Sequence, residues 1–385
     1  MPSHSPAPAS TAALRSAPFG TAPGGDAVEC WTLDSGTGVR AEVLTYGAVL
    51  RSLTVPDTAG RTADVVLGLP TLADYTAEQP YLGAVVGRYA NRLAHGRFTL
   101  DGQDHQVPLN DRGHALHGGP DGFDRRVWQA GPADGNGPDA AALRLTLHSP
   151  DGDMGFPGAL DVEVVYRLTP DGTLSIDYRA RTDRATHLNL TNHAYFNLAG
   201  AGSGDILGHT LQLHSAAYLP VSAQSVPLGP VEPTAGTPFD FTAAHPIGER
   251  IGESHVQLTD AGGYDHCWVL AAPEAGRPPL PAARLTDPAS GRCLEVWTTE
   301  PGIQVYTGNS LDGALKGADG RAYGRHGAVC LETQHYPDAP NRPEYPSTVL
   351  RPDGLYRSRT EFRFPHLPVS DGSSAAPRAE GTDAR

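Results

Sequence analysis

Residues 160–180 read L-D-V-E-V-V-Y-R-L-T-P-D-G-T-L-S-I-D-Y-R-A, and their pattern decides the fold class. Apolar side chains occupy alternate positions over 160–168, and residues 174–180 repeat the alternation. A period of two is typical of a β-strand that buries one face. The intervening P-D-G at 170–172 is a turn signal, so the stretch predicts an antiparallel β-hairpin.

Strand signals of the same kind recur along the chain, at residues 41–45, 49–53, 143–147, 293–299 and 303–307. Helical periodicity is limited to Leu72–Glu78 and Pro246–Ile251. The 45 glycines and 35 prolines favour many short strands joined by turns over long helices. We therefore predict an all-β fold, a large antiparallel β-sandwich with few short helices.

The composition excludes several classes of function. The formal net charge is −14, whereas nucleic-acid binding needs a basic face, so we expect no nucleic-acid partner. No apolar run approaches a membrane span, and the four widely spaced cysteines match neither a disulfide framework nor a zinc ribbon. The first residues lack the apolar core of a signal peptide. We expect a cytoplasmic protein that contacts no membrane.

The two ends of the chain differ in composition from the rest. Residues 1–25 are rich in Pro, Ala, Ser and Gly, and residues 367–385 are similarly poor in large apolar side chains. Such composition is typical of flexible tails. Neither a linker nor an internal repeat divides the remainder, so we expect residues 26–366 to form a single domain.

One stretch combines strand alternation with an ionisable side chain. Residues 188–198 read L-N-L-T-N-H-A-Y-F-N-L. As one strand, this segment would direct His193 and the polar residues at 187, 189 and 191 to one face and Leu188 and Leu190 to the other. The polar face carries His, Asn and Thr rather than the Lys, Arg and Glu of a solvated surface, which favours a concave site.

A second stretch has the same design. Residues 329–337 read V-C-L-E-T-Q-H-Y-P, and here Glu332 shares a face with Gln334, opposite Leu331. Cys330 shares the face of Glu332, and we interpret this thiol as packing because nothing in the sequence activates it. An imidazole in the first stretch and a carboxylate in the second would make a general acid–base pair.

Three further motifs carry polar side chains, and each also has a plain structural interpretation. Asn91-Arg92 in G-R-Y-A-N-R (87–92) suits a sugar but also suits a surface turn. His114 and His117 form an H-x-x-H pair, but no carboxylate or Cys residue is placed with them in the pattern of a zinc motif, so we expect no metal. Asp265 in G-Y-D-H-C either accepts hydrogen bonds from a ligand or opens a strand as an Asx turn.

Taken in order, these strings resemble the aldose 1-epimerase (galactose mutarotase) family. The resemblance covers most of the region from Gly20 to Phe364, and several unusual strings recur in the family's order. The matching strings are G-R-Y-A-N-R (87–92), G-R-F-T-L-D-G (96–102), L-H-G-G (116–119), T-N-H-A-Y-F-N-L-A-G (191–200), Y-D-H (264–266), P-G-I-Q-V-Y-T-G-N (301–309) and L-E-T-Q-H-Y-P-D-A-P-N (331–341).

The resemblance implies a galactose mutarotase-like supersandwich, with residues 26–366 as one catalytic domain whose site lies on a concave sheet. It implies that Glu332 is the general base and His193 the general acid in anomer interconversion of free hexoses such as galactose and glucose. Because the acid must start protonated and the base ionised, we expect Glu332 to titrate below His193, and neighbours such as Arg92 would favour the carboxylate. Residues at sugar-contacting positions of the family are Asn91, Arg92, His117, Tyr195, Asp265 and Gln304.

The resemblance also implies that no metal or organic cofactor is required and that the partner is a small monosaccharide. We expect a monomer or a weak homodimer. Residue 194 departs from the family pattern, because Ala194 stands where a hydroxyl residue is common. A side-chain contact to the sugar at that position is therefore in doubt.

Three alternatives stay open. A hexose-6-phosphate 1-epimerase would need extra cationic groups for the phosphate. A glycosidase would need two carboxylates, for which Glu332 and Asp265 are the obvious pair, but that interpretation gives His193 no role. A non-catalytic carbohydrate-binding protein would bind galactose without turnover.

Overall fold

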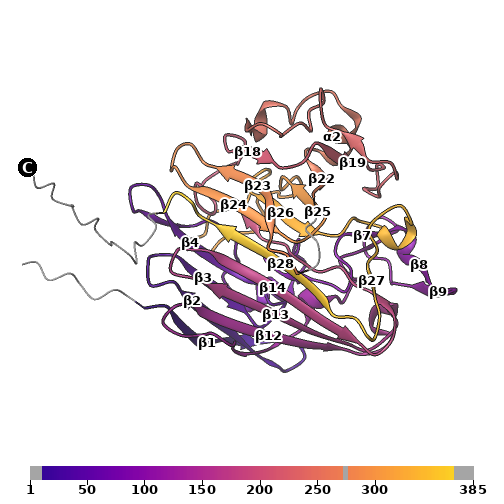
Figure 1. Cartoon of the computed structure of the whole chain (residues 1–385). Coiled ribbons are helices and arrows are strands. Elements are labelled where there is room, and N and C mark those ends of the chain that lie inside the picture. Colours follow the sequence, from indigo (N-terminus) through magenta and orange to yellow (C-terminus); the bar gives the residue numbers. More distant parts are fainter. Residues whose placement is uncertain (1–10, 272–275, 368–385) are drawn as a thin grey trace, which may run out of the picture.

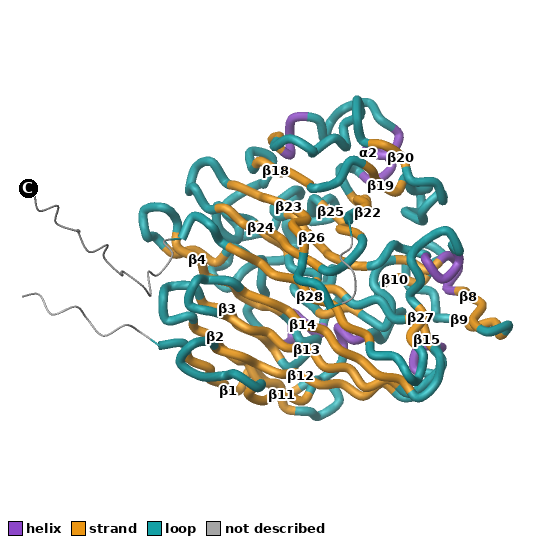
Figure 2. Tube along the Cα trace, viewed as in Figure 1, coloured by secondary structure: helices purple, strands orange, loops and turns teal. Residues whose placement is uncertain are grey.

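The computed structural model describes residues 11–271 and 276–367. Strands dominate these ranges, and helices are few and short (Figure 2). The two α-helices of the described chain are α1 (Leu72–Thr76) and α2 (Val256–Ala261). Five 3₁₀ turns complete the helical content: η1 (Ala94–Gly96), η2 (Phe123–Arg125), η3 (Asp153–Gly155), η4 (Ile247–Glu249) and η5 (Ala339–Asn341). The prediction of an all-β fold is confirmed.

A nine-stranded sheet forms the largest layer, and all of its strand pairs are antiparallel. Figure 1 shows yellow β28 between β14 and β24, which brings the C-terminal strand into the middle of this layer. In sheet order its strands are β11 (Gln129–Pro132), β12 (Ala141–Ser149), β13 (Leu160–Leu168), β14 (Leu174–Thr182), β28 (Tyr356–Arg363), β24 (Cys293–Thr298), β23 (Leu280–Thr286), β18 (Thr210–Leu213) and β21 (His245–Pro246).

The remaining strands form one six-stranded sheet, one five-stranded sheet and four strand pairs. The six-stranded sheet runs β17 (Tyr195–Phe196), β26 (Val329–Gln334), β25 (Gly302–Tyr306), β22 (Asp265–Val269), β19 (Ala217–Leu219) and β20 (Glu232–Pro233). The five-stranded sheet runs β1 (Ala13–Thr21), β2 (Ala27–Asp34), β3 (Arg40–Leu44), β4 (Leu50–Pro56) and β5 (Thr62–Asp64). The pairs are β7 (Arg92–Leu93) with β10 (Ala115–Leu116), β15 (Thr186–His187) with β27 (Val349–Leu350), β6 (Val85–Val86) with β16 (Thr191–Asn192), and β8 (Arg97–Leu100) with β9 (Gln103–Gln106).

The main hydrophobic core lies between the nine-stranded sheet and the other two large sheets. Val164 and Leu285 come from the nine-stranded sheet, Leu53 from the five-stranded sheet, and Ile303 and Leu331 from the six-stranded sheet, and all are buried in one cluster. Each strand contributes alternate residues to this core, as the sequence pattern predicts. The opposite face of the six-stranded sheet is therefore free to carry polar groups.

The predicted hairpin at 160–180 is confirmed. β13 and β14 pair without a register shift from Leu160↔Thr182 to Leu168↔Leu174. Gly172 in the connecting turn has φ = +83° and donates its N–H to Thr169 O. That backbone conformation favours glycine, which explains its place in the turn.

The predicted N-terminal tail is wrong in part, because residues 13–21 form β1, which pairs with β2. Leu14 and Phe19 are only partly exposed and pack against hydrophobic clusters. Because the surrounding residues are rich in Pro and Ser, the sequence pattern does not reveal Leu14 and Phe19 as buried positions. The edge of β2 supplies the hydrogen bonds that stabilise β1. Residues 1–10 of the predicted N-terminal tail, and residues 368–385 of the predicted C-terminal tail, lie outside the described residues.

The segment 188–198 is not one strand. It contains two short strands, β16 and β17, which pair with β6 and β26, and it follows β15, which pairs with β27. All of its residues are buried, because the segment passes through the interior and meets a different partner every few residues. The periodicity of a strand with one wet face therefore does not apply to it. No helix in the described part of the chain is long and apolar enough to cross a membrane.

We expect removal of residues 1–21 to lower the melting temperature by at least about 3 °C, because β2 loses one of its two antiparallel neighbours and Leu14 and Phe19 leave the clusters they cover. The measurement is thermal unfolding by circular dichroism. The matched control is a protein that begins at residue 11 and keeps β1. Equal melting temperatures for the two shortened proteins would show that β1 adds no stability.

Candidate functional site

A cavity of about 440 Å³ lies at the six-stranded sheet and its flanking loops. Seven of the eight residues singled out from the sequence line it, namely Asn91, Arg92, His117, His193, Tyr195, Asp265 and Glu332. The eighth, Gln304, adjoins the cavity through Asp265, whose Oδ1 accepts a hydrogen bond of 2.7 Å from Gln304 Nε2. This is the volume of a typical small-molecule pocket.

Strand alternation places the carboxylate. On β26, Leu331 enters the core, whereas Glu332 points to the opposite face. Glu332 pairs in register with Gln304 of β25, so these two side chains lie side by side on one face of the sheet. The predicted opposite orientation of Leu331 and Glu332 is therefore confirmed, on a strand that spans residues 329–334.

His193 faces Glu332 across the cavity floor, with 3.6 Å between its Nε2 and Glu332 Oε1. The backbone of His193 is fixed by two hydrogen bonds: its N–H donates to Ala84 O, and its carbonyl accepts from the Gly83 N–H. Both side chains are almost completely buried, at 6% and 2% residue exposure. Glu332 Oε2 has no hydrogen-bond partner among the described residues. It is therefore free to accept a proton, or a hydrogen bond from a hydroxyl group of a ligand.

Burial dominates the ionisation of this pair. It raises the pKa of Glu332 well above its usual value, with a further increase from the negative charge of Asp265 and an opposing effect of Arg92. It lowers the pKa of His193 to about 4. The expectation that Glu332 titrates below His193 is therefore wrong for the free cavity, because loss of water disfavours both charged forms. The pair holds one proton, and the uncharged arrangement is preferred.

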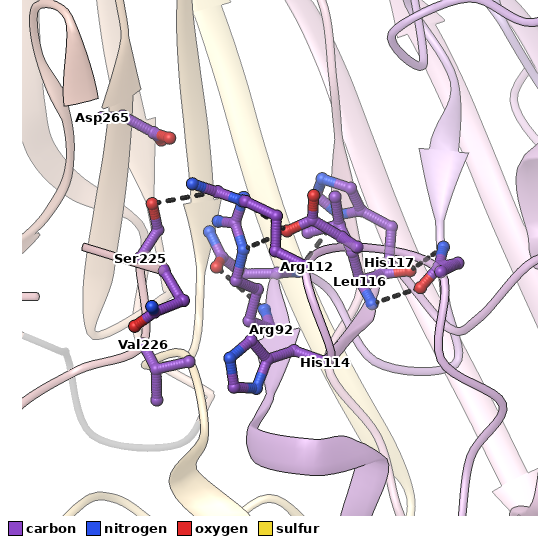
Figure 3. Close-up of polar contacts among 12 residues, drawn as sticks. Arg92, Arg112, His114, Leu116, His117, Ser225, Val226 and Asp265 are labelled. Atoms are coloured by element: carbon purple, nitrogen blue, oxygen red, sulfur yellow. Dashed lines mark hydrogen bonds and ion pairs between the residues drawn. The ribbon is translucent and has the colours of Figure 1, made fainter. Parts of the chain in front are cut away.

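Two arginines share one carboxylate at the wall of the cavity. Arg92 Nε donates to Asp111 Oδ2 at 2.8 Å, and Arg112 Nε lies 3.4 Å from the same oxygen. Although burial opposes ionisation of Asp111, these two guanidinium groups hold its pKa below the usual value. Arg112 also reaches across to Ser225 Oγ at 3.2 Å (Figure 3).

His117 and Asn91 are joined by two hydrogen bonds, one to the imidazole ring and one between backbone groups. The Asn91 N–H donates to His117 Nδ1 at 3.1 Å, and the His117 N–H donates to Asn91 O at 3.0 Å. Because Nδ1 accepts, the neutral ring carries its proton on Nε2 and presents a donor. Burial, and then the neighbouring His193 and Arg92, keep the pKa of His117 well below its usual value, so the ring is neutral.

Tyr195 contacts His193 rather than offering its hydroxyl to the cavity. Its ring stacks on the imidazole with centroids 5.1 Å apart and planes at 23°. Its hydroxyl donates to Pro80 O at 3.0 Å. The available face of Tyr195 is therefore its ring.

The H-x-x-H pair does not converge. His114 Nδ1 accepts from the His95 N–H, whereas His117 lies against His193, with ring centroids 5.2 Å apart. Potential ligand atoms of His117, His193 and Glu332 all lie within 4.8 Å of one another. Two of these groups, His193 and Glu332, also suit an acid–base pair, so their proximity has an explanation without a metal.

Residues elsewhere in the predicted polar face lie away from the cavity. His187 bonds Thr348 Oγ1 and Asn189 bonds Ala90 O, so the prediction that they share a face with His193 is wrong. The breaks between β15, β16 and β17 remove the common face. Ala194 packs in the main hydrophobic cluster, so its side chain points away from the ligand.

Several cavity residues were missed by the sequence argument. Tyr81 lies edge-on to His117, with ring centroids 4.5 Å apart, and Arg112 and Ser225 close one side of the cavity. The string Q-P-Y before the apolar run was the available signal for Tyr81. The remaining lining residues are Pro80, Asp111, Leu116, Asp260, Ala261, Tyr306, Asn309 and Ser310.

Comparison with known proteins places this geometry in a family. A family model described as aldose 1-epimerase matches residues 29–363. The chain belongs to the aldose 1-epimerase family. It is 43% identical to galactose mutarotase of Rattus norvegicus over 90% of this chain and 97% of that protein. It is 38% identical to aldose 1-epimerase of Escherichia coli K12, over 89% and 97% respectively.

Solved structures agree with this assignment. Galactose 1-epimerase from Lactobacillus acidophilus NCFM superimposes with a TM-score of 0.79 and 28% identity, covering 92% of this chain and 99% of that one. An aldose epimerase homologue from C. elegans superimposes with a TM-score of 0.75 and 29% identity, covering 86% of this chain and 97% of that one. The resemblance first seen in the motifs is confirmed, and the fold is the galactose mutarotase-like supersandwich.

A buried ion pair lies at the end of the strand that carries Glu332. His335 Nδ1 is 2.6 Å from Glu300 Oε2, and Tyr356 donates to Glu300 Oε1 at 3.3 Å. Burial is the largest single influence and lowers the pKa of His335, but the charge of Glu300 and its hydrogen bond together raise that pKa above its usual value. A raised histidine pKa contributes stability that is complete below about pH 6.5 and is lost as the pH rises through the folded-state pKa.

We therefore expect Glu300→Gln to reduce the free energy of unfolding by roughly 3–5 kcal/mol at pH 6 and by less at pH 9. Denaturant unfolding at the two pH values measures this difference. Glu249→Gln is the matched control, because its partner His245 is an exposed i,i+4 neighbour and the loss should stay below about 1 kcal/mol. A Glu300→Gln effect independent of pH would contradict the ion-pair assignment.

Proposed function

We propose that the protein interconverts the α and β anomers of free hexoses such as galactose and glucose. The observation that carries this proposal is the buried pair of His193 and Glu332, whose reactive atoms lie 3.6 Å apart on the floor of a sugar-sized cavity. Membership of the aldose 1-epimerase family and the names of its relatives support the same reaction.

The reaction needs two proton transfers at one anomeric centre. The Glu332 carboxylate takes the proton of the O1 hydroxyl, while the His193 imidazolium gives the Nε2 proton to the ring oxygen. The C1–O5 bond breaks and the C1–O1 bond becomes a carbonyl. Rotation about the C1–C2 bond turns the other carbonyl face to O5, and the two transfers in reverse close the ring. Atoms and protons balance without a metal or cofactor, and we propose none.

The proton inventory of the site suits this cycle. The pair holds one proton in either of two arrangements, uncharged or as an ion pair, and the reaction uses the second. A bound sugar supplies hydroxyl donors to Glu332 Oε2, and Arg92 already favours the carboxylate. We infer that binding moves the proton from Glu332 to His193, and that the sugar itself therefore prepares the catalyst.

We propose that the other polar groups orient the sugar. Arg92 and the Nε2–H of His117 are donors, and Asp265 is an acceptor held by Gln304. Asn91 fixes the turn that carries Arg92, since its side-chain oxygen accepts the Arg92 N–H. Tyr195 offers an aromatic face.

Hexose 6-phosphates are a second candidate substrate, because Arg112 adds a cation to the wall that already contains Arg92. Asp111 compensates part of this charge, which favours the free sugar. Comparing galactose with glucose 6-phosphate under one set of conditions separates the two substrates. We further propose a single catalytic domain, supported by a main core cluster that draws residues from all three large sheets. We also propose a cytoplasmic location, which the four free thiols within the described chain support, and a monomer or weak homodimer.

We expect Glu332→Gln and His193→Asn each to reduce kcat by at least about 10², because each removes one proton transfer. The measurement is polarimetry of freshly dissolved α-D-galactose at low buffer concentration. His148→Asn serves as control, because His148 lies exposed on the nine-stranded sheet. Near-normal turnover in either site variant would remove that residue from the mechanism, and release of aglycone from an aryl galactoside would favour a glycosidase.

The shared proton also predicts the pH dependence. The single-proton form is lost on the acid side as His193 gains a second proton, near its pKa of about 4, and on the alkaline side only above the raised pKa of Glu332. We therefore expect kcat/KM to show no decline near pH 6.5, where an unperturbed histidine would titrate. Polarimetry from pH 4 to 9 tests this, and a transition centred near 6.5 would show that His193 titrates as an ordinary histidine.

A further inference from the structure

The second nitrogen of His193 has a neighbour that the mechanism above does not use. Cys330 Sγ lies 3.5 Å from His193 Nδ1, and the Cys330 residue is fully buried. Cys330 precedes Leu331 and Glu332 on β26, and it pairs in register with Tyr195 of β17. The strand that carries the proposed base therefore also contacts the proposed acid.

The proposed reaction places a requirement on Nδ1. After Nε2 gives its proton to the ring oxygen, His193 is neutral and must hold its remaining proton on Nδ1. Only that tautomer leaves a lone pair on Nε2, which must take the proton back when the ring closes. A partner that accepts a hydrogen bond from Nδ1–H would fix this tautomer in both states of the imidazole.

We infer that Cys330 is a positioning residue, whose Sγ accepts the Nδ1–H of His193 and leaves Nε2 as the nitrogen that exchanges a proton with the sugar. The inference rests on the proposed function for its consequence, but its structural content concerns His193 alone. Tyr195 assists, because its ring covers one face of the imidazole while the thiol meets the ring edge.

A thiol suits this position better than the carboxylate that often accepts from a histidine. A carboxylate would add a negative charge and stabilise the imidazolium, which would hold the proton on His193 permanently. Burial raises the pKa of Cys330 well above its usual value, so the group stays a neutral thiol and a weak acceptor. The proton remains free to pass between His193 and Glu332.

Two substitutions separate the hydrogen bond from packing. Cys330→Ser keeps an acceptor and loses volume, whereas Cys330→Val keeps volume on a β-strand and loses the acceptor. Cys293→Val is the matched control, because Cys293 is also a buried strand thiol but contacts Thr286 in the nine-stranded sheet. The readouts are the ¹⁵N NMR shifts of the His193 ring, assigned with His193→Asn, and kcat and KM for galactose.

We expect wild type, Cys330→Ser and Cys293→Val to hold the Nδ1–H tautomer, and Cys330→Val to lose it. We expect kcat of Cys330→Val to fall about tenfold with KM nearly unchanged, as loss of one hydrogen bond implies. A protonated Nε2 in neutral wild-type His193 would overturn the inference. Retention of the Nδ1–H tautomer in Cys330→Val would also overturn it, because the thiol would then contribute only packing. Failure of the proposed function is distinct, since it would leave wild type without mutarotation whatever its tautomer.

Discussion

The site depends on one constraint, which is that a carboxyl and an imidazole share a single proton while both residues are almost completely buried. The low polarity of the surroundings disfavours both charged forms, and the small separation of the two groups makes transfer between them easy. A solvated pair would settle in its ionised form and exchange protons with buffer. A buried pair keeps its proton until a ligand alters the balance. The surrounding structure serves to hold these two groups in place.

Two features of the fold supply that rigidity. Glu332 lies on β26, where its pairing with Gln304 of β25 and a hydrophobic core beneath the strand restrict its movement. His193 lies on an irregular segment, but the residues around it form short pairs with three separate strands. The six-stranded sheet therefore positions Glu332, and the buried irregular segment positions His193. Precise geometry between them follows from packing rather than from a flexible loop.

The amino-acid sequence predicts the regular parts of this arrangement well. β13, β14 and β26 are each continuous strands with one face on the core, so the orientation of their side chains follows from pattern alone. The segment from 186 to 196 does not follow this pattern because it changes its partner strand every few residues. The Pro- and Ser-rich composition around β1 gives no strand signal. Asn91 and His117 adopt φ of +62° and +52°, and no periodicity indicates such a conformation. The order of titration also escapes the sequence, because it depends on burial and not on residue type.

The unpartnered oxygen atoms of the cavity favour a ligand that donates hydrogen bonds. Glu332 Oε2 and Gln304 Oε1 are buried without a hydrogen-bond partner among the described residues. Burial raises the pKa of Glu332 well above its usual value and so favours the protonated carboxyl in the absence of sugar. A ligand rich in hydroxyl groups would donate hydrogen bonds to these oxygens and would thereby stabilise the carboxylate form of Glu332. Recognition and activation are then one event, since the hydroxyls that bind are also those that permit Glu332 to ionise. An apolar ligand of equal size would fill the cavity yet leave the pair uncharged and inactive.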